Sequence, residues 1–304
     1  MSTLVTGGRG FVGRHIVDLL VEHGEEVVSY NRDFSIDNRP GVTAIQGELF
    51  DIPRLTRALF EHTVDRIIHT AGMSHPEVSI DLPLTTFAAN VEGTQGVYEA
   101  ARMTNVRRVV NFSSECAYGS LNEFETVTEA TACSPTTPYG VTKVTGEMLG
   151  KVYNDLYGMD IVSLRVTEVY GPGLWMPSVL GDMLRAAVDG VVFKLDYGRD
   201  HPFQFVYVQD VARAAYLASI ATAPRQHVYN ISGGSQVTLA QAANTLQALI
   251  PAAQIHLGEG HLPQWDRQGP FDISAAERCL GYQPQWPLEA GLRATIDWLV
   301  DQKR

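Results

Sequence analysis

The chain of 304 residues has little cysteine, fewer basic than acidic residues and no long apolar run. Its three cysteines, Cys116, Cys133 and Cys279, are too few and too scattered for a disulfide framework, and neither they nor the histidines have metal-ligand spacing. We therefore expect no metal site. Lys and Arg number 23 against 34 Asp and Glu, a formal net charge of −11, which argues against nucleic acid or an anionic membrane surface as a partner.

No segment approaches the roughly 20 apolar residues that span a bilayer. An apolar strand is expected almost at the first residue, which leaves no room for a cleavable signal peptide. These features predict a cytoplasmic enzyme with a small-molecule substrate. The length suits one large α/β domain, or a core with a smaller lobe.

Glycine is concentrated near the start of the chain. A short apolar strand (residues 4–5) runs into Gly7, Gly10 and Gly13, and a helical stretch from Phe11 to His23 opens within the glycine run. In this strand-to-helix context, Gly7 permits a tight turn and Gly10 lets backbone N–H groups approach a pyrophosphate at the helix N-terminus. Gly13 allows the helix to pack closely on the strand. The spacing therefore predicts a dinucleotide-binding turn.

Short apolar or β-branched runs alternate with helical segments through the first half of the chain. The expected strands are Val27–Tyr30, Val42–Gln46, Arg66–His69, Arg107–Phe112 and Ile161–Leu164. The expected helices are Pro53–Glu61, Leu82–Thr104 and Tyr139–Tyr157. This alternation predicts an α/β fold with a doubly wound parallel sheet, of the Rossmann type.

The character of the chain changes near residue 170, where Gly and Pro become frequent and the alternation fades. We predict a dinucleotide-binding core over residues 1–170 and a smaller, mixed α/β substrate lobe over residues 171–304, with residues 205–222 returning to the core. The expected elements of the lobe are a strand at His227–Ile231, a helix from about Thr238 to Leu249 and a last helix at Leu288–Val300.

Tyr139 and Lys143 are four residues apart on a predicted helix, so their side chains share one face. A nearby ammonium favours the phenolate of a tyrosine whose ordinary pKa is about 10. Such a pair suits proton exchange with a substrate oxygen while a hydride moves at the carbon. Upstream, a buried strand delivers Ser114 at its C-terminal end, where doubly wound sheets bind ligands. Ser114 is thus placed to hydrogen-bond the same oxygen.

At this point the chain resembles the extended short-chain dehydrogenase/reductase family, the group of UDP-galactose 4-epimerase and its relatives. The resemblance covers almost the whole chain. It is carried by the segments Thr6–Gly13, Ile68–Gly72, Asn90–Thr94, Val109–Gly119, Tyr139…Lys143, Leu164–Gly173, Phe205–Asp210 and Leu280–Pro284.

The resemblance implies that Ser114, Tyr139 and Lys143 are the catalytic trio, with Lys143 also bonding the nicotinamide ribose. It further implies cofactor contacts through Phe11, Val12, Glu48, Leu49, Thr70, Ala71 and Gly72, with Asn90 in support. For Asn90 a local cap or turn, and for the Glu48–Leu49 pair a plain loop, stay open as alternatives. Ser74, Ser114, Glu115, Tyr139 and Glu168 are the candidate substrate residues.

Two departures from the family pattern concern the cofactor. Members that use NAD usually end the second strand with an acidic residue, whereas this chain has Asn31 followed by Arg32. An amide beside a guanidinium suits a 2′-phosphate, and Arg9 adds positive charge. The sequence therefore favours NADP. NAD is the alternative, with Asn31 bonding an unphosphorylated ribose and Arg32 pointing to water.

Other departures concern the substrate. Nucleotide-sugar members commonly carry Asn at the position of Glu168 and Arg at that of Phe203, and both changes disfavour a diphosphate. Alternatively, Glu168 is a structural acceptor for backbone N–H groups. Glu115 is either a second acid/base group or a solvated turn residue. Cys116 stands where dehydratases of the family hold a carboxylate base, which argues against dehydration.

The resulting prediction is an NAD(P)-dependent oxidoreductase that interconverts an alcohol and a ketone on a small sugar-like or hydroxy/keto substrate lacking a nucleotide diphosphate. The alternative is a nucleotide-sugar 4-epimerase with tightly bound NAD. Members of the family commonly dimerise through the helices equivalent to Leu82–Thr104 and Tyr139–Tyr157, so a homodimer is expected.

Overall fold

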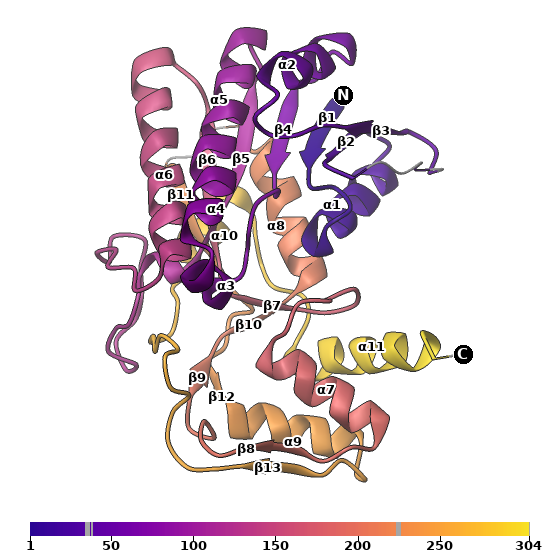
Figure 1. The fold of residues 1–304 in the computed structure, drawn as a ribbon, viewed down its shortest axis with the longest axis vertical. Coiled ribbons are helices and arrows are strands. Elements are labelled where there is room, and N and C mark those ends of the chain that lie inside the picture. Colours follow the sequence, from indigo (N-terminus) through magenta and orange to yellow (C-terminus); the bar gives the residue numbers. More distant parts are fainter. Residues whose placement is uncertain (34–36, 38, 223–225, 304) are drawn as a thin grey trace.

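A computed structural model describes residues 1–33, 37, 39–222 and 226–303. Its centre is a seven-stranded sheet (Figure 1) in which every pairing between neighbours is parallel. In spatial order the strands are β11 (Val228–Ile231), β6 (Ile161–Val166), β5 (Arg108–Ser114), β4 (Arg66–His69), β1 (Ser2–Thr6), β2 (Glu26–Asn31) and β3 (Val42–Gln46). The order reverses between β1 and β4, the place where doubly wound sheets bind ligands.

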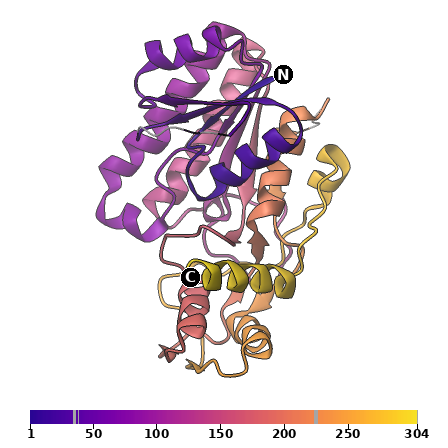
Figure 2. The ribbon, with the colours of Figure 1, turned by 90° about the vertical axis from the view of Figure 1, so that its right-hand side faces the viewer.

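Helices cover both faces of this sheet (Figures 1 and 2). One face carries α1 (Phe11–Glu22), α8 (Val208–Ile220) and α10 (Ser274–Leu280), and the other carries α2 (Ile52–Glu61), α5 (Gly93–Thr104) and α6 (Pro138–Tyr157). Successive strand residues point to opposite faces, so Val5 packs under α1 while Leu4 packs under α2. The predicted doubly wound α/β fold is confirmed.

A smaller lobe lies below the carboxyl edge of the sheet in Figure 1, with an apolar cluster of its own. Its helices are α7 (Val179–Asp189), α9 (Leu239–Leu249) and α11 (Leu288–Asp301). Its strands form three pairs: β7 (Glu168–Tyr170) with β10 (Phe205–Tyr207), β9 (Pro202–Phe203) with β12 (Val237–Thr238), and β8 (Phe193–Leu195) with β13 (Ile255–Leu257).

The chain crosses between the large sheet and the smaller lobe more often than its sequence suggested. The segment predicted to return to the core contains α8, which packs beside α1. The predicted strand near residue 230, assigned to the smaller lobe, is β11 and extends the large sheet beside β6. That assignment is wrong, because a short apolar strand carries no signal of which sheet it joins. The division at residue 170 stays a prediction.

The predicted helix at Leu82–Thr104 corresponds to continuous helical backbone from Pro83 to Thr104, whose hydrogen bonding changes to a π-helical turn at Ala88–Glu92. The structure has α3 (Pro76–Asp81), α4 (Pro83–Phe87), a π-helical turn η1 (Ala88–Glu92) and then α5. Leu82, with φ −125° and ψ 55°, separates α3 from α4, because a residue before proline avoids the helical region. The other helices predicted before residue 170 lie within a residue of their observed bounds.

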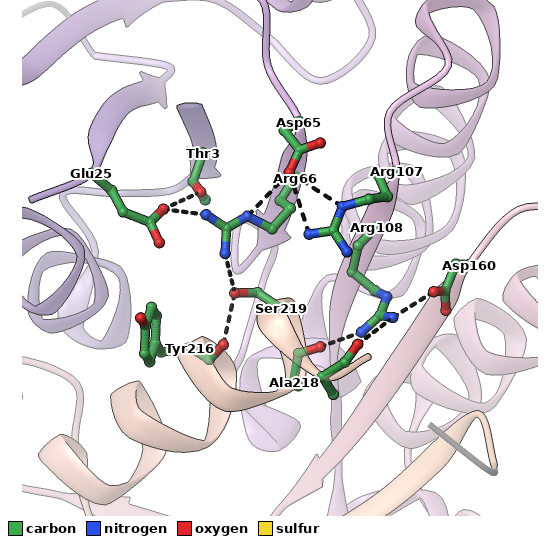
Figure 3. Close-up of polar contacts among 11 residues, drawn as sticks. Thr3, Glu25, Asp65, Arg66, Arg107, Arg108, Asp160, Tyr216, Ala218 and Ser219 are labelled. Atoms are coloured by element: carbon green, nitrogen blue, oxygen red, sulfur yellow. Dashed lines mark hydrogen bonds and ion pairs between the residues drawn. The ribbon is translucent and has the colours of Figure 1, made fainter. Parts of the chain in front are cut away.

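Two arginines are buried at the opposite, amino-terminal edge of the sheet. Arg66 on β4 and Arg108 on β5 are register partners and lie side by side (Figure 3). Arg66 pairs with Glu25 and donates to Ser219, and Arg108 donates to the carbonyl of Ala218. These bonds satisfy groups at the C-terminal end of α8, which has no basic side chain in its last turn. They hold α8 on the sheet, far from the carboxyl edge.

Candidate active site

The glycine-rich turn after β1 is built for close backbone approach. Gly7 has φ +70°, a left-handed value that favours glycine, and its N–H donates to the carbonyl of Tyr30 at 2.8 Å. Gly13 lies so close to this turn that a Cβ there would be 2.1 Å from the carbonyl oxygen of Gly7. The first turn of α1 has no acidic side chain and its N-cap is Gly10, so its free N–H groups favour an anion. The turn fits the pyrophosphate of a dinucleotide.

A cavity of about 900 Å³ extends from this turn along the carboxyl edge of the sheet to the smaller lobe. It brings together nearly all the residues that the sequence singled out. These are Gly7, Gly10, Phe11, Val12, Gly13, Asn31, Arg32, Glu48, Leu49, Thr70, Ala71, Gly72, Ser74, Ser114, Glu115, Tyr139, Lys143 and Glu168. The carboxyl ends of parallel strands meet at one edge, which explains why residues so distant in sequence share one cavity.

Asn90 does not line this cavity but supports its wall. Its Oδ1 accepts the N–H of Met73 at 2.8 Å, and its Nδ2 donates to the carbonyl of Met73 at 2.9 Å and to Thr142 at 3.0 Å. Asn90 thereby ties the loop after β4 to α6. The side chain lies within η1, and π-helical turns are frequent at functional sites.

The predicted catalytic trio meets where β5 ends and α6 begins. Thr137 caps α6, so Tyr139 and Lys143 stand in its first two turns with the Lys143 Nζ 5.3 Å from the centre of the Tyr139 ring. Lys143 also donates to the carbonyl of Phe112 on β5 at 2.7 Å. Ser114 at the end of β5 accepts the N–H of Cys116 at 3.2 Å. The helix cap and the strand end thus fix all three side chains.

Burial dominates the acid–base properties of this trio. It raises the pKa of Tyr139, and the nearby Cys116 thiol adds to this effect, while a hydrogen bond with Ser114 opposes it. In the protein alone this effect of burial outweighs the effect of the ammonium that the sequence predicted to favour the phenolate. Burial lowers the pKa of Lys143 to about 8, so this side chain is largely protonated at pH 7. In the protein alone the phenol is a neutral proton donor.

Two carboxyl groups face the same cavity from neighbouring strand ends. Glu115 begins a 3-10 turn, η2 (Glu115–Ala117), directly after β5, and Glu168 begins β7 just after β6. Burial raises the pKa of Glu168 to about 7. Burial, the charge of Glu168 and the charge of Asp266 together raise the pKa of Glu115 well above its usual range. The alternative in which Glu168 accepts backbone N–H groups has no such bond among the described residues.

At the adenosine end of the cavity the structure gives no support to a 2′-phosphate site. The Oδ1 of Asn31 accepts the N–H of Arg9 at 3.0 Å, and its Nδ2 donates to Ser29 at 3.0 Å. Arg32 is 74% exposed and its Nε lies 3.8 Å from a carboxylate oxygen of Asp33. A guanidinium beside a carboxylate has much of its charge compensated.

The smaller lobe adds a wall of which only Phe203 was connected with the substrate by the sequence, through the family resemblance. His201, Phe203 and Trp265 form a cluster of rings, with centroids 4.8 Å apart between His201 and Phe203 and 5.7 Å apart between Phe203 and Trp265. Asp266 and Gln268 line the same wall. These residues follow no motif with a fixed spacing, and only the packing of the lobe brings them to the cavity.

Within residues 1–33, 37, 39–222 and 226–303, no three His, Cys, Asp or Glu side chains are grouped as a metal site would require. The three cysteines are unpaired. Over the same residues no helix combines the length and apolarity needed to cross a membrane.

This fold and cavity define a dinucleotide-dependent enzyme of the short-chain dehydrogenase/reductase type. The sequence matches the NAD dependent epimerase/dehydratase family over residues 3–232, and the chain belongs to this family, an extended branch of that type. The predicted resemblance is confirmed.

The similar proteins act on nucleotide sugars. The dTDP-glucose 4,6-dehydratase 1 of Escherichia coli (strain K12) is 25% identical, with 100% of this chain and 94% of that protein covered. The structure of UDP-glucose 4-epimerase with UDP-glucose from Thermotoga maritima is 25% identical with a TM-score of 0.91, and all of both chains is covered. The UDP-glucose 4-epimerase of Thermus thermophilus, in complex with NAD, is 27% identical with a TM-score of 0.88, and 99% of each chain is covered.

Proposed function

We propose that this chain is an NAD-dependent nucleotide-sugar epimerase, which oxidises one hydroxyl of the bound sugar and reduces the resulting ketone on its opposite face. The observation that carries the proposal is the meeting of Ser114, Tyr139 and Lys143 in the cavity that opens from the dinucleotide-binding turn. Membership of the NAD dependent epimerase/dehydratase family and the likeness to the UDP-glucose 4-epimerase of Thermotoga maritima over the whole chain support it.

Two predictions from the sequence are revised here. NADP was favoured, but the family is NAD dependent and a similar epimerase is a complex with NAD. The side-chain amide of Asn31 is bonded to the backbone N–H of Arg9 and to Ser29, and Arg32 is largely exposed beside Asp33, so neither side chain is held in place for a 2′-phosphate. A substrate lacking a nucleotide diphosphate was also favoured, whereas the similar proteins act on nucleotide sugars and favour the alternative.

In this proposal NAD supplies the hydride acceptor and donor. The trio handles the substrate oxygen: Ser114 hydrogen-bonds it, and Tyr139 takes its proton during oxidation and returns it during reduction. Taking a proton requires the phenolate, which burial disfavours. The ammonium of Lys143, 5.3 Å from the ring centre, is the positive charge that this chain supplies to offset that cost.

The proposal places epimerisation ahead of two related reactions. Cys116 lines the cavity beside Ser114, and burial raises the pKa of its thiol to about 12, so it is a poor base for dehydration. A simple oxidoreductase releases its used cofactor and binds a fresh one in every cycle. An epimerase regenerates its bound NAD within the cycle and therefore needs no added cofactor.

The test is an assay of the purified protein with UDP-glucose and UDP-galactose and no added cofactor. We expect the two sugars to interconvert, and acid-denatured protein to release NAD in near-stoichiometric amount. Formation of free NADH with UDP-glucose, turnover only with added dinucleotide, or a 4-keto-6-deoxy product would instead identify an oxidoreductase or a dehydratase.

We also propose that two copies associate through α4 and α6. An apolar stripe runs along the outer side of α6 at Val141, Met148, Val152 and Leu156, with Met148 65% and Leu156 69% exposed. Leu84 on the adjacent α4 extends it. Burial of such a stripe favours a two-fold dimer. The cytoplasmic location stays a prediction.

Light scattering at micromolar concentration should therefore give twice the chain mass. Met148→Glu together with Leu156→Glu should give a monomer, since each places a charge in the apolar stripe. The matched change Glu289→Lys on the exposed side of α11 should leave the mass unchanged. A monomeric wild-type protein would refute this arrangement.

A further inference from the structure

The part of the cavity formed by the smaller lobe and the ends of β5 and β6 is lined by three carboxyl groups and, among the described residues, by no basic side chain. Glu115, Glu168 and Asp266 line it. Asp266 accepts hydrogen bonds from Ser120 at 2.6 Å and from Thr136 at 2.8 Å. The carboxylates of Glu115 and Glu168 have no hydrogen-bond or ion-pair partner among the residues that the structure describes.

No basic side chain in the described part of the chain lines this wall, although Arg267, between Asp266 and Gln268, is close enough for its charge to add to the effect of burial on the pKa of His201. Among the described residues that line it, from 113–116, 166–178, 201–204, 264–266 and 268, none is Lys or Arg. Lys143 stands across the cavity, where it donates to the carbonyl of Phe112.

Buried carboxylates elsewhere in the molecule are satisfied. Glu147 accepts from the guanidinium of Arg165 at 2.8 and 2.6 Å. Asp210 accepts the backbone N–H groups of Gln285 and Trp286 at 2.8 to 3.0 Å. Burying a charge without such a partner is costly. Glu115 and Glu168 differ from these two residues, because they are only partly buried, face the open cavity and have no partner among the described residues.

The same wall contains a buried histidine with an unpartnered ring nitrogen. His201 is 1% exposed, and its Nδ1 has no hydrogen-bond partner among the described residues. Burial lowers the pKa of His201 to about 4, so the ring is neutral near pH 7 and offers an acceptor nitrogen. The rings of Phe203 and Trp265 adjoin it, and aromatic faces attract cations.

We infer that Glu115 and Glu168 form the binding site of a primary ammonium group on the sugar, so the substrate is a nucleotide sugar with a free amine. This inference rests on the proposed function. An ammonium has three N–H donors and a positive charge, which match two carboxyl groups that face the cavity. A hydroxyl brings no charge, and a sugar carboxylate adds a third negative group to this wall.

The acid–base state of the wall agrees with this assignment. Burial raises the pKa values of Glu115 and Glu168, and like charge adds to the rise at Glu115, which is the direction expected for carboxyl groups that lack a cation. A cation placed between them opposes both shifts.

The experiment is calorimetric titration of the NAD-loaded protein with UDP, UDP-glucose, UDP-glucosamine, UDP-6-amino-6-deoxyglucose and UDP-glucuronic acid. We expect at least one of the two amino sugars to bind tenfold or more tightly than UDP-glucose, and UDP-glucuronic acid to bind more weakly. Glu168→Gln and Glu115→Gln should each reduce the amino-sugar preference at least fivefold. Glu77→Gln, which changes an exposed carboxylate at the cavity rim, should preserve it.

The outcomes separate a failure of the inferred ammonium site from a failure of the proposed function. If UDP and UDP-glucose bind but both amino sugars match UDP-glucose within threefold, the inference is wrong and the proposed function stands. A preference that survives in both Glu168→Gln and Glu115→Gln also overturns it. If UDP itself fails to bind, the proposed function fails, and the inference falls with it.

Discussion

Replacing Tyr139 with phenylalanine should lower kcat by about 10²- to 10⁴-fold, the usual effect of removing a general acid–base group. The change deletes only the hydroxyl that exchanges a proton with the substrate oxygen. The backbone N–H of Tyr139, which donates to Ser79 at 3.0 Å, and the cap of α6 are untouched. We therefore expect the variant to fold and to retain its NAD. The measurement is steady-state epimerisation together with NAD content after denaturation.

Two further variants make this result specific. Tyr153→Phe, on the same helix, removes a hydroxyl that donates to Glu99 at 2.6 Å outside the cavity, so it should cost at most about 1 kcal/mol of stability and leave kcat unchanged. Lys143→Met should lower both turnover and NAD retention, because the same ammonium is expected to favour the phenolate of Tyr139 and to hydrogen-bond the nicotinamide ribose. Wild-type turnover in Tyr139→Phe would rule out the mechanism.

Gly13→Ala should be the most damaging single methyl addition in the dinucleotide turn. The added Cβ would lie 2.1 Å from the carbonyl oxygen of Gly7 and 2.8 Å from its carbonyl carbon. Since both are backbone atoms in a tight turn, relief requires α1 to move away from β1. We expect a loss of about 2 kcal/mol or more in the free energy of unfolding, and NAD affinity at least 100-fold lower.

Gly146→Ala is the matched control for this prediction. Gly146 lies within α6, and a Cβ there meets only ordinary contacts, at 3.6 Å from Asn111 and 3.8 Å from Thr94. Alanine is favoured over glycine within a helix, so this variant should gain about 0.5–1 kcal/mol. Denaturant unfolding of both variants and titration with NAD are the measurements. Equal NAD affinity in Gly13→Ala and wild type would refute the assigned role of the turn.

The local sequence signals were sufficient for the large sheet and most of its helices. Buried strands such as Arg66–His69 and capped helices such as α6 carry their own periodicity and end signals, so their bounds needed no tertiary information. The helix predicted over Leu82–Thr104 begins one residue later, at Pro83, and only its π-helical turn, which holds Asn90 and its bonds to the loop at Met73, was not predicted. Strand β11 was placed in the wrong part, because its partner β6 lies far away in sequence.

Most of the candidate site was predictable for a related reason. Gly7, Ser114 and Tyr139 each stand at the end of an element whose direction follows from the alternation, and a parallel sheet gathers such ends at one edge. The preference for NADP rested on residue type alone, whereas the bonds of Asn31 to the backbone N–H of Arg9 and to Ser29 depend on how the glycine-rich turn and β2 lie together.

The sequence by itself therefore determined the fold class, the dinucleotide turn and the Ser114–Tyr139–Lys143 trio, because each rests on spacing within one element or on the common direction of parallel strands. Only the tertiary structure decided which carboxyl groups have a hydrogen-bond or ion-pair partner. It gave Asp266 two hydroxyl partners, left Glu115 and Glu168 with none among the described residues, and set His201 beside Phe203 and Trp265. Burial and pairing depend on residues brought together from distant parts of the chain, and these two properties fix the electrostatics of a site.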